Sequence, residues 1–470
     1  SVFTAACGQK EPVDVEDDTP EVVDEPDGDT VEEPTEPIGQ ITIGNTTALT
    51  ADWSIMWSNN SADVDVKSFI TGYDTVVTNM DGEYIINPTV VADHEITENE
   101  DGSKTYTWTI NDGLTFDDGT PITAENYVAY YAFWASPVIA EAEGYNTAGY
   151  DLIGWSDYAS GEADKFAGVK LIDEMTFSTT INPESLPDFF ELTLVSSEPI
   201  KLDYWTDDTV EVISDDEGVY LSDNFTHENF GDKIQEARFG LLPSTGPYVL
   251  ESYDEASKTA VLQVNEKFLG NYEGRKPLIQ TIVYKEVTNE TAIDELSTGG
   301  VDILSSINNG DLINAGLDLV DKGGIEYTDY PRAGYGKLTL ICDHGPTQFV
   351  EVRQALAHLL DRNDFAKSFT GGFGSVVNGP YGEAQWFYQE TKSELNEKLN
   401  PYPYSLEEAV KLLEEGGWVY DKDGNDYPGE GLRYKKLEDG TLMPLKLKWA
   451  STEDNEVSDL LVIKLKENPD

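Results

Sequence analysis

Residues 101–127 read DGSKTYTWTINDGLTFDDGTPITAENY and constrain the fold more than any other stretch of the chain. Tyr106, Trp108 and Ile110 alternate with threonines, which is the period-two pattern of a strand with one buried face. The stretch therefore opens on a predicted strand whose aromatic side faces a core.

Two turn signals follow this strand. The runs NDG at 111–113 and DDG at 117–119 bracket residues 114–116, which predicts a tight turn and a second short strand. Pro121 and Thr123 then predict the start of a helix. That helix carries four aromatic residues at helical spacing, which favours packing in a core over contact with a ligand: Tyr127, Tyr130, Tyr131 and Trp134.

Similar patterns predict elements outside this stretch. They are a strand at 41–44, a helix opened by Asp63 with Val66, Phe69, Ile70 and Tyr73 on one face, a hairpin of 170–173 and 175–179, a strand at 445–450 and a helix at 455–466. Strands and helices alternate irregularly over 470 residues. Such a mixture predicts an α/β or mixed α+β fold in several lobes.

The chain is strongly acidic. Lys plus Arg number 30 against 90 Asp plus Glu, which gives a formal net charge of −60. Binding of nucleic acid or anionic lipid needs basic residues to neutralise phosphates, so we expect neither partner. Self-repulsion at this charge favours a monomer.

The N-terminus resembles the end of a bacterial lipoprotein signal. Residues 1–7 read SVFTAAC, with small residues before Cys7, although Thr4 stands where Leu or Val is usual and no basic or apolar start precedes it. The resemblance implies cleavage before Cys7 and a lipid on its sulfur, and an incidental cysteine is the alternative. Residues 8–40 contain thirteen acidic residues, five prolines and no aromatic residue. They predict a disordered linker, because they cannot bury enough apolar surface to offset chain entropy.

Cys342 is the other cysteine. It follows Leu338, Leu340 and Ile341, and this apolar context predicts a buried, inert thiol.

The order of motifs resembles one protein family. The stretch 101–127 and the hairpin at 170–179 are similar to patterns of the peptide/nickel-binding extracellular solute-binding proteins, family 5, which serve as receptors of ABC importers. Further motifs follow in the order of that family: STGPYVL at 244–250, NEKFLG at 265–270, the segment 292–303, VRQALAHLLDR at 352–362 and the segment 406–418.

The resemblance implies a periplasmic-binding-protein-like fold with a hinge between two main bodies. The implied parts are a signal remnant at 1–7, the linker at 8–40, lobe I at 41–80 and 193–286, lobe II at 81–192, and an incomplete lobe III at 287–470. In the family, lobe III continues further and carries an Asp that pairs with the peptide's α-ammonium. We expect that residue to lie beyond Asp470.

The implied function is capture of oligopeptides between the lobes and their delivery to a membrane permease, on the extracellular face of a lipid-anchored protein. Two alternatives stay open: an oligosaccharide-binding member of the same family, and a surface receptor outside transport. Enzyme activity, a cofactor and a metal site are not expected. The four histidines lie far apart, and no nucleophile elbow or phosphate-binding glycine loop is present.

The resemblance also implies where a ligand binds. Lobe I would contribute the loop before the first helix, whose amides suit a peptide backbone, although asparagines satisfied within a turn are the alternative. Lobe III and the strand that leads into it would contribute aromatic residues, for which core packing is the alternative. The candidates are Trp57, Ser58, Asn59, Asn60, Tyr284, Tyr335, Asn378, Tyr381 and Trp386.

Overall fold

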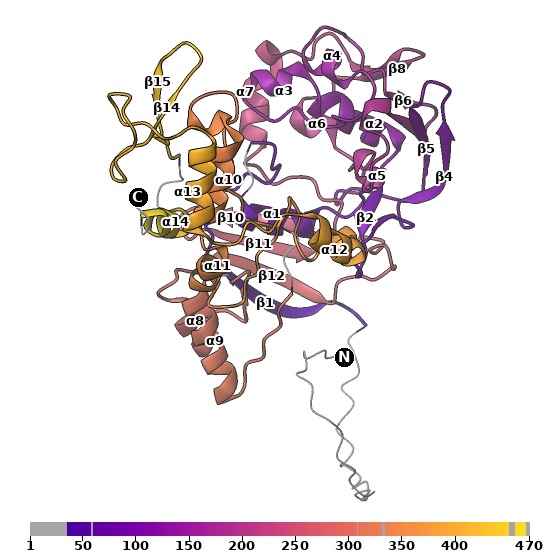
Figure 1. Cartoon of the computed structure of the whole chain (residues 1–470). Helices are drawn as coiled ribbons and strands as arrows, with labels where there is room; N and C mark the ends of the chain where they lie inside the picture. Colours follow the sequence, from indigo (N-terminus) through magenta and orange to yellow (C-terminus); the bar gives the residue numbers. More distant parts are fainter. Residues whose placement is uncertain (1–34, 58–59, 308, 331–333, 451–455, 467–470) are drawn as a thin grey trace, which may run out of the picture. The chain divides into compact units, whose positions relative to one another are not determined.

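A computed structural model describes residues 35–57, 60–307, 309–330, 334–450 and 456–466, and residues 37–470 form one compact unit (Figure 1). Cys7 lies outside the described residues. No helix in the described ranges combines the length and apolar character needed to cross a membrane.

A five-stranded sheet joins distant parts of the chain. Its order is β10-β11-β12-β1-β13, with β1 parallel to both of its neighbours and β10, β11 and β12 antiparallel. The strands are β1 (Ile38–Asn45), β10 (Tyr248–Asp254), β11 (Thr259–Val264), β12 (Ile279–Glu286) and β13 (Ile303–Ser305). Residues 38–40 were predicted as linker, and this was wrong, because backbone pairing with β12 begins at Ile38.

Helix α1 (Ser61–Ile70) packs against this sheet. Val66 and Ile70 on α1 share a buried cluster with Leu250 and Ile282 of the strands. The prediction that Asp63 opens the helix was wrong by two residues, because the side chain of Asn60 caps it. Tyr73 is buried as predicted, but it lies beyond the end of α1.

A four-stranded antiparallel sheet has the order β4-β5-β7-β6. The predicted strand is confirmed as β5, in which Tyr106, Trp108 and Ile110 are buried. The predicted hairpin of 170–179 is confirmed as β6 and β7. The strands are β4 (Val91–Glu98), β5 (Lys104–Ile110), β6 (Val169–Leu171) and β7 (Thr176–Ile181).

The segment after β5 differs from the prediction. Residues 114–116 form no strand but a single bridge between Thr115 and Pro121, while Leu114 and Phe116 are buried beside the sheet. The predicted helix is confirmed as α2 (Ala124–Trp134) with Thr123 as its N-cap. Tyr127, Tyr131 and Trp134 are buried as predicted, whereas Tyr130 is only partly buried and lines a cavity.

Short elements complete this half of the chain. They are β2 (Val76–Thr78), β3 (Tyr84–Ile86), α3 (Pro137–Glu141), α4 (Trp155–Ala159), α5 (Glu191–Leu194), α6 (Leu202–Trp205), β8 (Val212–Asp215), β9 (Gly218–Leu221) and α7 (His227–Ala237).

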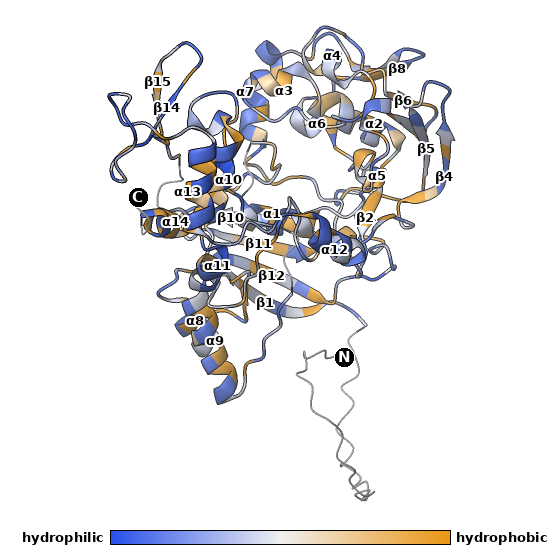
Figure 2. Cartoon of the chain, viewed as in Figure 1, coloured by the Kyte–Doolittle hydropathy of each residue, from blue (hydrophilic) through white to orange (hydrophobic). Residues whose placement is uncertain are grey.

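The C-terminal part is mainly helical. Helices α10 and α13 pack together over a small core that includes Val352, Leu413 and Trp418, and hydrophilic residues follow the outer side of α13 (Figure 2). The elements are α8 (Ala292–Thr298), α9 (Gly310–Lys322), α10 (Val350–Leu359), α11 (Arg362–Thr370), α12 (Trp386–Lys398), α13 (Leu406–Glu415), β14 (Tyr434–Lys436), β15 (Leu442–Pro444) and α14 (Glu456–Lys466).

Two predictions in this part were wrong. Residues 445–450 form no strand, because the paired segment is Leu442–Pro444, which meets β14 instead. Cys342 is exposed, since residues 334–342 lie outside helices and strands and bury little surface. The helix predicted at 455–466 is confirmed over Glu456–Lys466.

Candidate functional site

The loop between β1 and α1 is held in place by a buried aspartate. Asp63 accepts hydrogen bonds from the backbone N–H groups of Thr50 (2.9 Å) and Ala51 (3.2 Å), and from the Thr50 hydroxyl. Burial raises the pKa of the Asp63 carboxyl, and these three hydrogen bonds oppose that rise. The loop therefore has a defined shape where it approaches the candidate residue Trp57.

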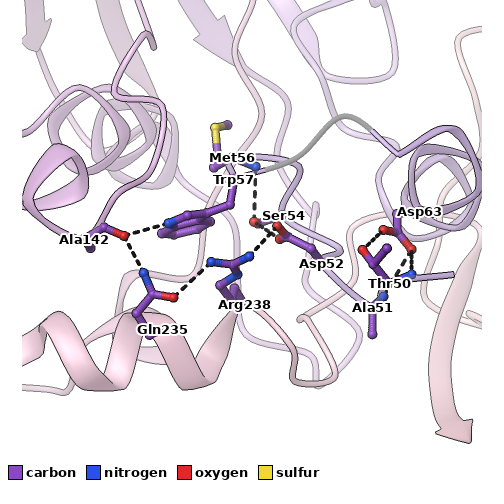
Figure 3. A network of polar contacts seen from close by, with 10 residues as sticks. All are labelled: Thr50, Ala51, Asp52, Ser54, Met56, Trp57, Asp63, Ala142, Gln235 and Arg238. Atoms are coloured by element: carbon purple, nitrogen blue, oxygen red, sulfur yellow. Dashed lines mark hydrogen bonds and ion pairs between the residues drawn. The ribbon is translucent and has the colours of Figure 1, made fainter. Parts of the chain in front are cut away.

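A second aspartate connects this loop to α7 (Figure 3). Asp52 is 1% exposed and accepts from the Arg238 guanidinium at 3.2 Å and from the Ser54 hydroxyl at 2.8 Å. Arg238 also donates to the Gln235 side chain at 3.0 Å. The loop and the end of α7 are thus joined by a largely buried ion pair.

Trp57 lies in the centre of this network. The Arg238 guanidinium lies 4.6 Å from the Trp57 ring centroid and 4.5 Å from that of Phe239, which is cation–π geometry. The indole N–H of Trp57 donates to the Ala142 carbonyl at 2.7 Å, and the Gln235 amide donates to the same oxygen (Figure 3). The ring is therefore fixed at its N–H edge by the Ala142 carbonyl and on its face by Arg238.

Gly144 makes room for this ring. A methyl group added at Gly144 would lie 3.0 Å from the Trp57 ring and 2.9 Å from the Ile139 side chain. Only glycine fits this approach without movement of Trp57.

A cavity of about 200 Å³ lies beside Met56, the residue before Trp57. The Met56 carbonyl accepts from the Tyr145 N–H at 2.7 Å, which joins the loop to the segment after α3. The lining also includes Tyr130, Ala148, Gly149, Tyr150, Asp151, Thr193, Leu194 and Ser196.

Tyr130 is, with Tyr150, one of two tyrosines that line this cavity. Burial and the nearby Glu198 carboxylate raise the pKa of its phenol well above the ordinary value. The hydroxyl therefore stays protonated. A lining of aromatic, apolar and hydroxyl groups with one carboxylate, that of Asp151, suits binding of a side chain more than chemistry on it.

The loop candidates divide as follows. Ser58 and Asn59 lie outside the described residues. The Asn60 side chain caps α1, accepting from the N–H groups of Ala62 and Asp63, and donates to the Ala48 carbonyl at 3.0 Å. Contact of Asn60 with a ligand stays a prediction.

Two aromatic candidates are corrected. Tyr284 is 1% exposed, and its hydroxyl accepts from Asn45 and donates to Asp65, each at 2.7 Å. Tyr381 is buried and stacks on Tyr388 at 5.0 Å between ring centroids. Both were predicted to face a ligand, and we remove both because their surfaces and the Tyr284 hydroxyl are used within the protein.

Trp386 packs against the other half of the chain. Its ring centroid lies 4.5 Å from that of Phe189 and 5.9 Å from that of Phe190. Phe387 approaches the same two rings at 5.8 and 5.9 Å. The structure thus joins α12 to the segment before α5 through aromatic contacts.

The remaining two candidates occupy different places. Tyr335 is exposed in the segment 334–342. Asn378 lines a second cavity, of about 230 Å³, and its side-chain oxygen accepts from Arg362 at 3.1 Å. The structure does not bring either residue beside Trp57 in any described contact.

Arg238, Gln235 and Arg362 were missed from the sequence. The sequence did carry one signal for the arginines. Only six arginines occur in a chain of net charge −60, so each of them could have been expected to pair with a carboxylate. The neutral partners of Gln235 and Arg362, the Ala142 and Val377 carbonyls, carry no sequence signal at all. In the described part of the chain, no group of three or more His, Cys, Asp or Glu side chains is arranged to hold a metal ion.

Comparison with known proteins places the chain in a family. The family model of the bacterial extracellular solute-binding proteins, family 5, matches residues 86–457. The chain therefore belongs to this family, whose members are extracellular or periplasmic solute-binding components of transporters and not enzymes. The predicted family and fold class are confirmed.

Individual relatives are distant. The dipeptide-binding protein of Escherichia coli (strain K12) is 25% identical over 235 residues, which cover 47% of this chain and 40% of that protein. Heme-binding protein A of Haemophilus influenzae is 24% identical over 174 residues, covering 37% and 29%. The chain spans less than half the length of these two relatives.

A solved structure has a similar fold. Lactococcal OppA, complexed with an endogenous peptide in the closed conformation, superposes with a TM-score of 0.64 at 18% identity, covering 91% of this chain and 74% of that one. At this identity the likeness concerns the fold alone.

Proposed function

We propose that this chain is the substrate-binding component of an ABC importer, which captures oligopeptides and delivers them to a membrane permease. The observation that carries the proposal is the cavity lined by Met56, which the anchored Trp57 follows in the chain, in a protein of the solute-binding family. A wall fixed before binding loses little conformational freedom when a ligand arrives.

The ligand would meet the wall as follows. Tyr130 of the cavity lining offers an aromatic ring, Trp57 follows the lining residue Met56 in the chain, and the loop residues 46–57 offer backbone groups. Backbone hydrogen bonds give affinity for a peptide without reading its side chains, while a cavity of about 200 Å³ takes one side chain. Ser58, Asn59, Asn60, Tyr335, Asn378 and Trp386 remain proposed contacts on this reading.

Native mass spectrometry of the gently purified protein tests the proposal. A ladder of peptide masses in the released ligand would support it and set the preferred length. A protein that ignores a peptide pool and retains an oligosaccharide, or a haem as the Haemophilus influenzae relative is named for, would replace the ligand class. Binding of a macromolecule alone would favour a surface receptor.

Replacement of one indole tests the wall directly. Trp57→Phe keeps a smaller aromatic ring and removes the hydrogen bond to Ala142, so we expect peptide affinity to fall about tenfold as the ring loses its fixed position. Trp108→Phe is the matched control, because its indole also makes one hydrogen bond, to Thr179 at 3.1 Å, inside the four-stranded sheet. Equal peptide affinity in the two variants by calorimetry would remove Trp57 from the site.

The proposal includes a lipid anchor at Cys7 and a monomeric receptor on the extracellular side of the membrane. The SVFTAAC sequence and the net charge of −60 support these points. In the native host, Cys7→Ser should release the protein from the membrane fraction. A variant that stays with the membrane would contradict the anchor.

A further inference from the structure

The second cavity carries an arginine whose charge is not balanced by a carboxylate. It lies between the start of α11 and the segments 376–378 and 401–404. The Arg362 guanidinium donates to the Val377 carbonyl at 3.2 Å, to the Asn378 side-chain oxygen at 3.1 Å and to the Pro401 carbonyl. All three acceptors are neutral.

The arginines differ in their partners, in a chain with three acidic residues to each basic one. Among the described arginines, Arg238, Arg275 and Arg433 each lie within ion-pair distance of a carboxylate, whereas Arg362 and Arg353 do not, and of these two only Arg362 lines a cavity. Burial lowers the pKa of Arg362. The guanidinium is therefore partly desolvated and has no carboxylate within ion-pair distance among the described residues.

Asn378 presents a second donor. Because its side-chain oxygen accepts from Arg362, its amide N–H₂ is turned away from the guanidinium. Asn363 adds another amide to the lining. Asp361 is the opposing charge, and one of its oxygens already caps α11 through the Asp364 N–H at 3.0 Å.

The rest of the lining is apolar, and His358 fixes part of it in place. Leu360, Val376, Pro401 and Pro403 form it together with the rings of Tyr402 and Tyr404. His358 fixes the proline-tyrosine segment, since its ring nitrogen bonds to the Pro403 carbonyl at 2.6 Å and its ring lies 5.5 Å from that of Tyr402. A volume of about 230 Å³ exceeds that of several water molecules.

We propose that this cavity binds a carboxylate with an apolar substituent, held by Arg362 and Asn378. A carboxylate can accept from the Arg362 N–H groups that its three bonds to neutral oxygens leave unused and from the Asn378 amide, and it supplies a negative charge, while the substituent lies against the tyrosine and proline walls. The carboxylate has two possible sources: the C-terminal residue of a bound peptide, which rests on the proposed function, or a free monocarboxylic acid, which does not.

The test uses four probes that isolate the carboxylate. They are N-acetylleucine and N-acetylleucinamide, and a pentapeptide and its C-terminal amide. Titration calorimetry should show that N-acetylleucine binds and that its amide binds at least about tenfold more weakly, since the charge-assisted pair is lost. Equal binding of acid and amide, or binding of neither, would overturn the proposal.

Asn378→Asp is the decisive variant. The new carboxylate keeps an acceptor for Arg362 and neutralises it within the protein, so the fold is retained while the site is filled. We expect N-acetylleucine affinity to fall at least about tenfold. Asn396→Asp adds the same charge on an exposed face of α12 and should leave affinity unchanged.

Arg362→Met and Arg353→Met form a second matched pair. Arg353 also donates only to carbonyls, those of Thr347 and Gln348, and lies outside the cavity lining. Only Arg362→Met should abolish N-acetylleucine binding. If Asn378→Asp and Asn396→Asp bind the acid equally, the proposal is wrong whatever the arginine variants show.

The two pentapeptides identify the source of the carboxylate. If the free-acid pentapeptide loses affinity in Asn378→Asp and its amide does not, the carboxylate is the peptide's own. If both pentapeptides bind equally while N-acetylleucine still binds wild type, the cavity takes a free acid. Failure of both pentapeptides to bind wild type would count against the proposed function and not against this cavity.

Discussion

At the scale of single residues, buried charge dominates the candidate site. The Asp52–Arg238 pair spans 186 positions of the chain and links the loop before α1 to the end of α7. A buried ion pair is costly to break from one side, because the remaining charge has lost its water without a partner.

Arg238→Met should therefore lower the free energy of unfolding by about 3–5 kcal/mol, measured by urea denaturation. Arg275→Met is the control, because Arg275 is 76% exposed in its pair with Glu273 and should change stability by less than about 1 kcal/mol. Similar losses in the two variants would show that the Asp52 carboxylate is not desolvated.

Asp74 introduces a pH dependence. Burial, together with the Glu198 carboxylate, raises its pKa from 3.8 to about 7, and Lys67 opposes this rise. Between these two values the folded protein keeps a proton that the unfolded chain releases. The stability contributed by Asp74 therefore falls as pH rises through this window, and the loss is complete above pH 7.

Asp74→Asn should remove this loss. We expect the variant to be more stable than wild type at pH 8 by at least about 1 kcal/mol and similar to it at pH 4. Asp81→Asn, on an exposed turn, controls for the general relief of negative charge. A pH-independent difference, in urea midpoints measured across this range, would contradict the raised pKa.

At the scale of elements, Asn60 at the start of α1 has a structural role that can be tested separately from its proposed contact with a ligand. Asn60 caps the helix through its oxygen, and aspartate caps helices equally well.

Asn60→Ala should therefore lower the free energy of unfolding by about 1 kcal/mol, whereas Asn60→Asp should retain most of the stability. Peptide affinity measured on both variants then decides the predicted contact. If Asn60→Asp is as stable as wild type and binds peptide as tightly, the side chain serves the helix alone.

The way strands and helices pack also explains why some aromatic predictions were wrong. The alternation in β5 and the helical spacing in α2 are local patterns, and both elements form where predicted. Tyr284 lies on β12, whose pairing with β1 places it opposite Ile43. Tyr381 precedes α12 and stacks on Tyr388 of that helix. Strand pairing and helix packing, which no local pattern reports, decide which way these rings face.

At the scale of the whole molecule, we expect repulsion from the net charge of −60 to affect stability more than any single ion pair does. Like charges at this density repel one another over distances shorter than the Debye length, which is about 10 Å at 0.1 M salt and shorter above that.

The urea midpoint should therefore rise as NaCl is increased from about 0.05 to 0.5 M, because screening relieves the repulsion in the compact state. Sorbitol at equal osmolality is the control for effects on water. A midpoint that responds equally to sorbitol and to NaCl would show that the charges are already balanced locally.

The amino-acid sequence by itself determined the family, the mixed α/β class and the strand and helix of residues 104–134, because these depend on residue types and their local spacing. Only the tertiary structure decided that Asp52 meets Arg238, that Arg362 meets neutral oxygens, and that Cys342 is exposed. These contacts join residues far apart in the chain, and their free energy depends on burial and distance, which arise only when the elements pack.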